Sequence, residues 1–242
     1  MSARARKRPP SVVITGASQG IGAAVAACFA REVQGVRLAL LARNANNLRK
    51  IATACRRLGA EADVVPCDAS DEASVAAAAH TVLGAGGAPD VLVNNAGRFA
   101  GASFLEITTE AFDSLVRDNL RSVFLVSKAF VPAMAKRGSG HVFNMSSIAG
   151  LQAYPAGAGY CAAKFGVTGL SAVMRRELRE NGVQVTTVFP GATWTPSWAG
   201  SGFGPERMMP AESIAKAIVD AWRLGPAAVV EDIVLRPPGG DL

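Results

Sequence analysis

Histidine and cysteine are scarce in this sequence, and their scarcity argues against a metal centre. The 242 residues include two histidines and four cysteines, and no two cysteines form a CxxC pair. A structural zinc site is usually built from such pairs. The cysteines fall inside apolar segments, so we expect them to be buried and reduced, as in a reducing compartment. We expect the two histidines, His80 and His141, to be exposed and to have no catalytic role.

The sequence also lacks long hydrophobic runs. None approaches the ~18 residues that a membrane-spanning helix requires. The basic first residues are followed by only three apolar ones, Val12, Val13 and Ile14, before polar residues return. Such a run is too short for the core of a signal peptide. We therefore expect a soluble, cytoplasmic protein that does not contact membranes.

Charged residues make up only 18% of the chain, and the net charge of +6 is unevenly spread. Four positive charges, on Arg4, Arg6, Lys7 and Arg8, lie within the first ten residues, and the rest of the chain is nearly balanced. A body without a basic face has no surface that follows a phosphate backbone. We expect residues 1–10 to form a disordered basic tail, and we expect no nucleic-acid partner.

Apolar residues are plentiful, since half of the chain is hydrophobic. Short runs rich in Val, Leu and Ile alternate with longer stretches of helical length. The runs that we expect to be strands are 12–15, 36–42, 62–66, 90–94, 140–145, 183–189 and 228–235. The expected helices are 21–33, 44–58, 71–84, 108–136, 159–181 and 211–224. This alternation predicts a single doubly wound α/β domain over residues 11–242, with a mostly parallel seven-stranded sheet and helices on both faces.

Two segments interrupt this alternation, and each follows the end of an expected strand. Residues 146–159 are rich in Ala, Gly and Ser, and residues 191–210 contain Gly, Pro, Trp and Met without a clear period. In a doubly wound sheet, the loops after strand ends hold ligands. We expect the second segment, about 191–210, to be a substrate loop.

A glycine-rich turn lies between the first expected strand and the first expected helix. Its glycines are Gly16, Gly20 and Gly22. Glycine lets a backbone turn tightly and approach a pyrophosphate, whose charge the N–H groups of the following helix stabilise. The alternative is a turn that serves packing alone, and the strand–turn–helix context favours the phosphate site.

Several motifs, in order, resemble those of the classical short-chain dehydrogenase/reductase family over about residues 11–235. They are Thr15-Gly16-Ala17-Ser18-Gln19-Gly20-Ile21-Gly22, Asn94-Asn95-Ala96-Gly97, Tyr160-x-x-x-Lys164 and Pro190-Gly191. Within the family, the chain is similar to NADP-dependent carbonyl and 3-oxoacyl reductases. The resemblance implies a Rossmann fold, an NADP(H) cofactor and a small-molecule substrate that is interconverted between carbonyl and alcohol.

The resemblance also implies which residues contact the cofactor. They are Gly16, Ser18, Gln19, Gly20, Ile21, Gly22, Arg43, Asp68, Asn94, Ala96, Gly97, Tyr160, Lys164, Pro190, Gly191, Thr193 and Thr195. The second expected strand ends in Ala42-Arg43, without the acidic residue that binds the ribose 2′-hydroxyl of NAD. A guanidinium suits the 2′-phosphate of NADP, although solvated surface arginines are common. Asp68 either accepts a hydrogen bond from the adenine amino group, as the resemblance implies, or caps a helix.

Tyr160 and Lys164 are four residues apart in an expected helix, which places both side chains on one face. A nearby ammonium favours the phenolate and lowers the pKa of a tyrosine, although this spacing also occurs by chance. The resemblance assigns Tyr160 as the general acid–base catalyst and Lys164 as its partner. It also implies that Ser147 hydrogen-bonds the substrate oxygen and that Asn119 is a link in a proton relay. Asn119 falls on an apolar helical stripe, so the alternative is a core amide satisfied by the backbone. Ser146 is expected to bond to the backbone.

The substrate is expected to contact side chains from the irregular segments. The assigned residues are Ser147, Leu151, Tyr154, Trp194 and Trp198, with Arg98, Phe99, Phe203 and Met208 as further candidates. Gly200, Gly202 and Gly204 would let the second segment open and close as a lid. Since these side chains carry little charge, we expect a largely apolar ketone or aldehyde.

Two alternative functions are weighed against the oxidoreductase. A sensor or scaffold that binds NADP without turnover usually lacks a catalytic residue, and this chain has all four. Enoyl reduction or dehalogenation on the same fold usually comes with an altered Tyr–Lys spacing or a replaced lysine. Relatives are often tetramers, so we expect a homo-oligomer, either a dimer or a tetramer.

Overall fold

The centre of the structure, a computed structural model that describes residues 8–198, 202 and 204–240, is a parallel sheet. Its seven strands lie in the order β3-β2-β1-β4-β5-β6-β9. They are β1 (Ser11–Thr15), β2 (Arg37–Ala42), β3 (Glu61–Pro66), β4 (Val91–Asn94), β5 (Gly140–Met145), β6 (Val183–Pro190) and β9 (Asp232–Leu235). Each neighbouring pair is parallel. The central strands are apolar runs covered on both faces, as a parallel sheet requires.

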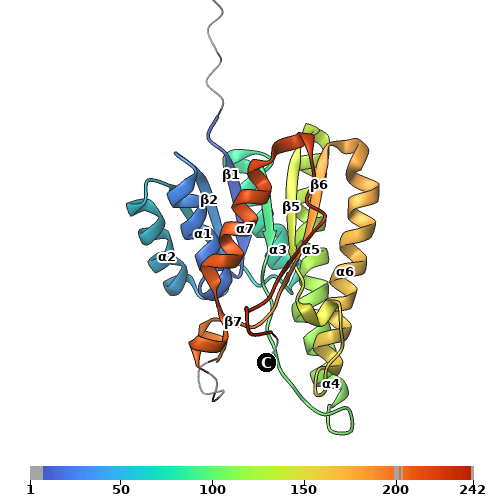
Figure 1. The fold of residues 1–242 in the computed structure, drawn as a ribbon. Helices are drawn as coiled ribbons and strands as arrows, with labels where there is room; N and C mark the ends of the chain where they lie inside the picture. Colours follow the sequence, from blue (N-terminus) through green and yellow to red (C-terminus); the bar gives the residue numbers. More distant parts are fainter. Residues whose placement is uncertain (1–7, 199–201, 203, 241–242) are drawn as a thin grey trace, which may run out of the picture.

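Helices cover both faces of this sheet (Figure 1), so the predicted doubly wound fold is confirmed. They are α1 (Gly20–Glu32), α2 (Ala45–Arg57), α3 (Glu72–Gly86), α4 (Thr109–Val116), α5 (Ser122–Arg137), α6 (Ala158–Leu178) and α7 (Ala211–Arg223). The π-helical turn η1 (Arg117–Arg121) joins α4 to α5. Short 3-10 turns are η2 (Ile148–Gly150), η3 (Arg179–Asn181), η4 (Pro196–Trp198), η5 (Pro205–Arg207) and η6 (Gly225–Ala227). A separate pair of short strands, β7 (Thr193–Trp194) and β8 (Met209–Pro210), lies beyond β6.

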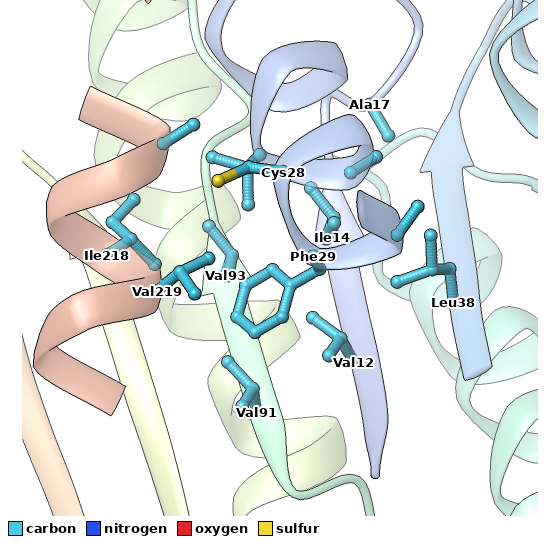
Figure 2. Close-up of a cluster of buried hydrophobic side chains, with 14 of the residues drawn as sticks. Val12, Ile14, Ala17, Cys28, Phe29, Leu38, Val91, Val93, Ile218 and Val219 are labelled. Atoms are coloured by element: carbon cyan, nitrogen blue, oxygen red, sulfur yellow. The ribbon is translucent and has the colours of Figure 1, made fainter. Parts of the chain in front are cut away.

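Two hydrophobic clusters hold the helices to the sheet. The first lies under α1, α2 and α7, and Figure 2 shows Phe29 of α1 among strand residues, with Ile218 and Val219 of α7 nearby. The second lies under α3 and α5, where Phe130 and Met134 are fully buried. Burial of each such large side chain contributes roughly 1.5–3 kcal/mol. The sheet is therefore a rigid platform whose strand ends position the loops beyond them.

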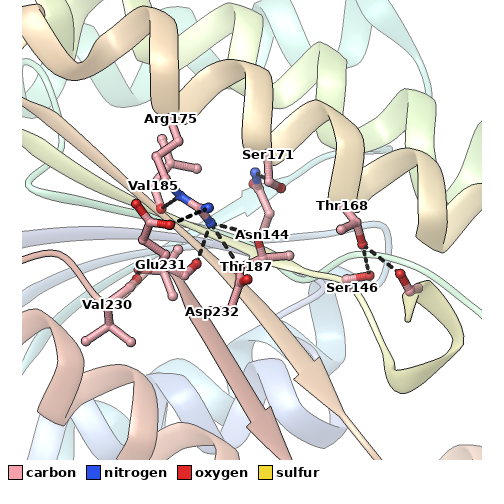
Figure 3. Close-up of polar contacts among 12 residues, drawn as sticks. Asn144, Ser146, Thr168, Ser171, Arg175, Val185, Thr187, Val230, Glu231 and Asp232 are labelled. Carbon is pink, nitrogen blue, oxygen red and sulfur yellow. Dashed lines mark hydrogen bonds and ion pairs between the residues drawn. The ribbon is translucent and has the colours of Figure 1, made fainter. Parts of the chain in front are cut away.

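Arg175 of α6 anchors the edge strand β9 (Figure 3). Its guanidinium donates to the carbonyl of Val185 at 3.0 Å and to the hydroxyl of Thr187 at 3.1 Å, both in β6. It also pairs with Asp232 at 3.0 Å and with Glu231 at 3.4 Å. A planar guanidinium has enough donors to hold several partners at once. This anchor holds β9 in place. The C-terminal segment continues from β9 and passes the loop that follows β6.

The boundaries of three expected elements differ from the sequence prediction. Residues 228–231 are irregular, because the amide of Gln184 rather than a strand partner binds the carbonyl of Ala228. The expected helix 108–136 is interrupted by the η1 turn. The expected helix 159–181 is α-helical only as far as Leu178. Other element ends agree within about two residues, the usual scatter of such boundaries.

The expectation that His141 is exposed is wrong. Its side chain is only 3% exposed and stacks on Phe143 with the ring centroids 4.0 Å apart. The ring Nε2 lies 2.7 Å from the hydroxyl oxygen of Thr186, and burial lowers the pKa of His141 to about 4. A position near the start of a central strand is covered from both faces, which the local sequence does not reveal. His80 is exposed and the four cysteines are buried and unpaired, as predicted.

Part of the expected tail contacts the domain. Arg8 pairs with Asp90 at 2.9 Å, and the carbonyl of Pro10 accepts a hydrogen bond from the N–H of Arg37 at 2.9 Å. Arg8 and Pro10 are thus in contact with the folded domain. Arg4, Arg6 and Lys7 lie outside the described residues.

Within residues 8–198, 202 and 204–240, no helix is both long enough and apolar enough to cross a membrane. The same part of the chain holds no group of three or more His, Cys, Asp and Glu side chains placed to bind a metal ion.

Candidate active site

The glycine-rich turn links β1 to α1 in a conformation that requires its glycines. Gly16 and Gly20 have positive φ angles, 65° and 56°, which side chains disfavour. A Cβ on Gly22 would collide with the carbonyl oxygen of Gly16. Ser18, Gln19 and Ile21 lie in the same turn. Among the described residues no side chain caps α1, so its first N–H groups face a cradle that fits a pyrophosphate.

Arg43 and Asp68 follow the ends of β2 and β3. Arg43 is exposed, and its charge acts on Asp68, whose carboxylate accepts hydrogen bonds from the N–H and hydroxyl of Ser70 at 2.9 and 2.8 Å. These hydrogen bonds, and to a smaller degree Arg43, hold the pKa of Asp68 below its usual value. The cap of α3 is Asp71, which accepts from the N–H of Ser74 at 2.7 Å. Asp68 is therefore not the helix cap.

The turn after β4 is tied to the glycine-rich turn. The hydroxyl oxygen of Thr15 accepts from the N–H groups of Asn95 and Ala96 at 2.9 and 3.0 Å. The side-chain amide of Asn95 donates to the carbonyl of Thr15 at 3.0 Å, so this side chain has a structural role. The two turns are thus held as one unit at the switch point between β1 and β4, where doubly wound sheets bind ligands.

Asn94 lies deeper than a cofactor contact requires. Its side-chain amide donates to Ser127 at 2.9 Å and to Asn144 at 2.8 Å, and the residue is 2% exposed. Its amide oxygen has no partner among the described residues. The side chain therefore joins β4 to α5 and β5 within the core, and only its position at the strand end adjoins the cradle.

Ser147 and Tyr160 come together beyond the end of β5. Ser147 donates to the carbonyl of Pro190 at 3.4 Å and accepts from the N–H of Ala149 at 3.2 Å. It also hydrogen-bonds Tyr160, which lowers the pKa of the phenol, although burial is the larger effect and raises it. Ser146 instead donates to the carbonyl of Lys164 at 3.0 Å, so its expected backbone bond is confirmed. Its hydroxyl also lies 3.2 Å from that of Thr168 (Figure 3).

Lys164 is buried one helical turn beyond Tyr160. Its Nζ donates to the carbonyl of Met145 at 2.8 Å and lies 5.5 Å from the centroid of the Tyr160 ring. Burial lowers the pKa of Lys164 to about 8. Met145 could not be identified from its residue type, because its backbone carbonyl anchors the ammonium and any residue supplies such a carbonyl.

Asn119 sits in the η1 turn, where the helix widens. Its amide donates to the carbonyls of Leu115 and Arg98 at 3.0 and 2.9 Å, and its oxygen accepts from the N–H of Arg98 at 3.1 Å. The side chain is thus satisfied by the backbone, which was the alternative to a water-binding role. Gly97 lies against both Asn119 and Lys164. A Cβ on Gly97 would be 2.5 Å from the Asn119 side-chain oxygen and 3.8 Å from the Lys164 Nζ.

The loop after β6 reaches back to the glycine-rich turn. The N–H of Gly191 donates to the carbonyl of Leu235 at 2.7 Å, and the hydroxyl of Thr193 donates to the carbonyl of Gly191 at 2.9 Å. Thr195 lies against Gly20, where a Cβ would be 3.2 Å from the Thr195 methyl. Pro190 at the loop's start accepts the Ser147 bond. All of the assigned cofactor residues therefore lie at one end of the sheet.

Comparison with known proteins places the chain in a family. Residues 10–202 match the profile of the short chain dehydrogenases. The chain belongs to the short-chain dehydrogenase family. It is 37% identical to a sepiapterin reductase of Chlorobaculum tepidum over 96% of this chain and 97% of that protein. It is 33% identical to a putative ketoacyl reductase of Streptomyces coelicolor over 94% of this chain and 82% of that protein.

Solved structures agree with this family membership. An alcohol dehydrogenase from the archaeon Thermococcus sibiricus, complexed with 5-hydroxy-NADP, matches with a TM-score of 0.87 and 31% identity over 95% of this chain and 97% of that one. A variant of actinorhodin polyketide ketoreductase with NADPH matches with a TM-score of 0.86 and 28% identity over 95% and 96% of the two chains. This short-chain dehydrogenase is thus an oxidoreductase by family.

The assigned substrate residues of this short-chain dehydrogenase are spread around the same end of the sheet. Leu151, Tyr154 and Trp194 are 44%, 36% and 38% exposed, large fractions for apolar or aromatic side chains. Trp198 is half-buried, and Met208 is buried, although it lines a pocket together with Pro237 and Gly239. Phe203 and Gly200, assigned to the same loop, lie outside the described residues.

Proposed function

We propose that this short-chain dehydrogenase is an NADP(H)-dependent oxidoreductase that interconverts a carbonyl and an alcohol, with Tyr160 as its general acid. The observation that carries this proposal is the position of the Lys164 Nζ, 5.5 Å from the centroid of the Tyr160 ring, with Ser147 close enough to the phenol to lower its pKa. The three groups converge beside the glycine cradle, whose backbone leaves no room for a side chain.

The cofactor is NADP(H), and the residues at the strand ends suit it. The turn at Gly16, Gly20 and Gly22 would hold the pyrophosphate against the start of α1. The exposed Arg43, with no acidic residue at the end of β2, would meet the 2′-phosphate. The matched alcohol dehydrogenase and ketoreductase were solved with 5-hydroxy-NADP and NADPH, which supports this choice. When bound, the nicotinamide supplies or accepts the hydride.

The residues around the reacting oxygen divide the proton chemistry among them. Burial raises the pKa of Tyr160, so the phenol stays protonated near neutral pH and is ready to donate. Lys164, whose pKa is about 8, is mostly charged at pH 7 and would stabilise the phenolate that donation leaves. Ser147 would orient the substrate oxygen through its hydroxyl. Asn119 positions the Gly97–Arg98 backbone beside Lys164 rather than acting on the proton directly.

The substrate is an uncharged, largely apolar ketone or aldehyde. Leu151, Tyr154 and Trp194 leave much of their surface exposed near Ser147 and Tyr160. Apolar walls with few polar groups favour apolar ligands. The relatives named sepiapterin reductase and ketoacyl reductase are consistent with carbonyl reduction. We place the reaction in the cytoplasm, because the four cysteines are unpaired and buried.

The test is NADPH consumption over a panel of ketones, aldehydes, quinones and 3-oxoacyl thioesters, in wild type and Tyr160→Phe. Loss of the phenolic proton should lower turnover by roughly a hundredfold or more while NADPH binding stays nearly unchanged. Tyr154→Phe is the matched control, because it removes the chain's other tyrosine hydroxyl. It should lower turnover by less than about tenfold.

Two outcomes would contradict the proposal. Full activity in Tyr160→Phe would show that another group is the acid. NADPH binding without consumption of any carbonyl would instead favour the sensor or scaffold, which binds the cofactor without turnover.

A further inference from the structure

Phe99 makes a contact that the proposed chemistry does not explain. It is 58% exposed although it is apolar, and its ring packs edge-to-face on the Tyr160 ring with centroids 5.2 Å apart and planes at 90°. Aromatic pairs prefer this arrangement, which contributes beyond the area that it buries. Phe104, further along the same loop, is 83% exposed and has no aromatic partner within the described part of the chain.

The backbone that carries Phe99 is firmly held. The preceding Arg98 is bonded through both its N–H and its carbonyl to Asn119, and its guanidinium pairs with Asp118 at 2.6 Å and donates to Ser114 at 2.8 Å. The backbone that precedes Phe99 is therefore held in place beside the η1 turn.

The far side of the ring is held by Gly101. A Cβ on Gly101 would lie 3.2 Å from the ring's Cζ, so the ring lies directly on the glycine backbone. The next residue, Ala102, donates its N–H to the carbonyl of Ala156 at 3.0 Å, which ties this loop to the one that carries Tyr154. Phe99 is thus held between the Tyr160 ring and the Gly101 backbone, although more than half of its surface is exposed.

We propose that Phe99 is a positioning and specificity-determining residue, which fixes the ring of Tyr160 and selects flat, conjugated carbonyl substrates over saturated ones. This inference rests on the proposed function, because it assumes that Tyr160 is the acid. An aromatic ring beside the reacting carbon can stack on or meet the edge of a flat substrate, whereas a puckered saturated ring makes poorer contact. The exposed part of Tyr154, which borders the same phenol, offers a second aromatic surface.

Removal of the Phe99 ring should also change the titration of Tyr160. The titratable groups that face the phenol are Lys164 and Cys161 on α6 and Tyr154 in the loop before it, and Ser147 bonds to it from beyond β5. None of them is changed by the substitution Phe99→Ala. Because burial raises the pKa of Tyr160, water admitted beside the ring lowers that pKa. Carbonyl reduction requires the protonated phenol. The alkaline limb of the pH–rate profile for reduction should therefore move to lower pH.

The experiment compares Phe99→Ala, Phe99→Tyr and the control Phe104→Ala with wild type. The substrates are acetophenone and cyclohexyl methyl ketone, which differ in the flatness of one ring. For Phe99→Ala, kcat/KM for acetophenone should fall about three- to tenfold more than kcat/KM for the cyclohexyl ketone. The alkaline limb of the pH profile should shift downward, and Phe99→Tyr should restore both properties. Phe104→Ala should behave as wild type, and all variants should keep their melting temperature because both side chains are exposed.

The outcomes separate this inference from the proposed function. If Tyr160→Phe is inactive but Phe99→Ala matches Phe104→Ala in selectivity and pH profile, Phe99 has no such role. A wild-type preference for the cyclohexyl ketone, or reduction of neither ketone while other carbonyls react, also overturns the inference. An active Tyr160→Phe overturns the proposed function itself.

Discussion

His141 shows how a single buried residue makes stability depend on pH. Its ring is 3% exposed, its Nδ1 has no partner among the described residues, and its pKa is lowered by burial to about 4. In the unfolded chain the same group titrates near pH 6.5, at about the unperturbed value. Protonation therefore favours the unfolded chain. The stability that neutral His141 contributes is complete above about pH 6.5 and is lost as the pH falls toward about 4.

The expected loss reaches about 3 kcal/mol at pH 4, since each pH unit between the two pKa values corresponds to about 1.4 kcal/mol. The measurement is urea unfolding of wild type and His141→Gln at pH 7.5 and pH 5. Carboxylates titrate in both proteins, so the difference between the two pH dependences isolates His141. An equal loss of stability in both proteins would show that the histidine is not the responsible group.

Arg43 is the residue on which the choice between NADPH and NADH depends. A charged hydrogen bond to the 2′-phosphate contributes about 1.5–3 kcal/mol, or roughly tenfold to a hundredfold in affinity. NADPH should therefore bind more tightly than NADH, and Arg43→Asp should invert the order. The measurement is the dissociation constant of each cofactor by fluorescence titration.

The control for Arg43→Asp is Arg57→Asp, which makes the same change of charge at the other end of α2. A 13-residue helix separates the two sites by about 18 Å, beyond the screening length at physiological salt. Arg57→Asp should leave the ratio of affinities unchanged. Equal binding of NADPH and NADH by the wild type would show that Arg43 does not contact the phosphate.

At the scale of elements, the loop between β5 and α6 contains a strained residue. Ala156 has a φ of 60°, and it is the sole residue other than glycine in the described chain with a positive φ. This conformation costs a side chain roughly 1–2 kcal/mol. Its carbonyl accepts the bond from Ala102 that ties the two loops beside Tyr160. The strain is thus located at the loop contact that borders the candidate active site.

Ala156→Gly should relieve this strain and stabilise the protein by about 1 kcal/mol, or roughly 2–4 °C in Tm. Ala153→Gly in the same loop is the control. Its φ is not positive, so the added freedom of the unfolded chain should lower stability by about 0.4–1 kcal/mol. The measurement is calorimetric or fluorescence melting. A lower Tm in Ala156→Gly would mean that the loop does not hold the strained conformation in solution.

The elements themselves were largely predictable from the sequence, because buried parallel strands are short apolar runs separated by helices. The resemblance to the short-chain dehydrogenase family assigned Ser147, Tyr160 and Lys164 to one site, and the structure brings them together. What the sequence could not supply was backbone detail. The η1 turn that carries Asn119 has the composition of ordinary helix, and the Met145 carbonyl that holds Lys164 has no side-chain signal.

His141 was misjudged for a related reason. A histidine that begins a strand is exposed at a sheet edge and buried at the centre, and the strand order decides which applies. Phe112 and Phe124 lie on the same apolar helical stripe as Asn119, yet they are 37% and 50% exposed. A helical period identifies an apolar face, and it does not tell whether this chain or another molecule covers that face.

At the scale of the whole molecule, the outer surface of α5 and α6 suggests what covers it. The two helices pack against each other on one face of the sheet (Figure 1). Phe124 on α5 is 50% exposed, and Phe165 and Val173 on α6 are 45% and 51% exposed. Gly169 lies between the last two, and a Cβ on it would meet nothing within 4 Å. Such an exposed apolar surface is typical of contacts between subunits.

We therefore expect the protein to be a homo-oligomer, a dimer or a tetramer, assembled through α5 and α6 of two copies. In a two-fold interface each residue is present once on each copy. A charge at position 165 should therefore destabilise the interface at two places. Burial of one phenylalanine contributes about 1.5–3 kcal/mol, so Phe165→Glu should weaken association by roughly a hundredfold or more. The measurement is molar mass by light scattering during size-exclusion chromatography, over a range of concentrations.

Phe104→Glu is the control, because Phe104 is 83% exposed on a different loop, and it should leave the mass unchanged. A monomeric wild type, or an unchanged mass for Phe165→Glu, would show that α5 and α6 do not form the interface.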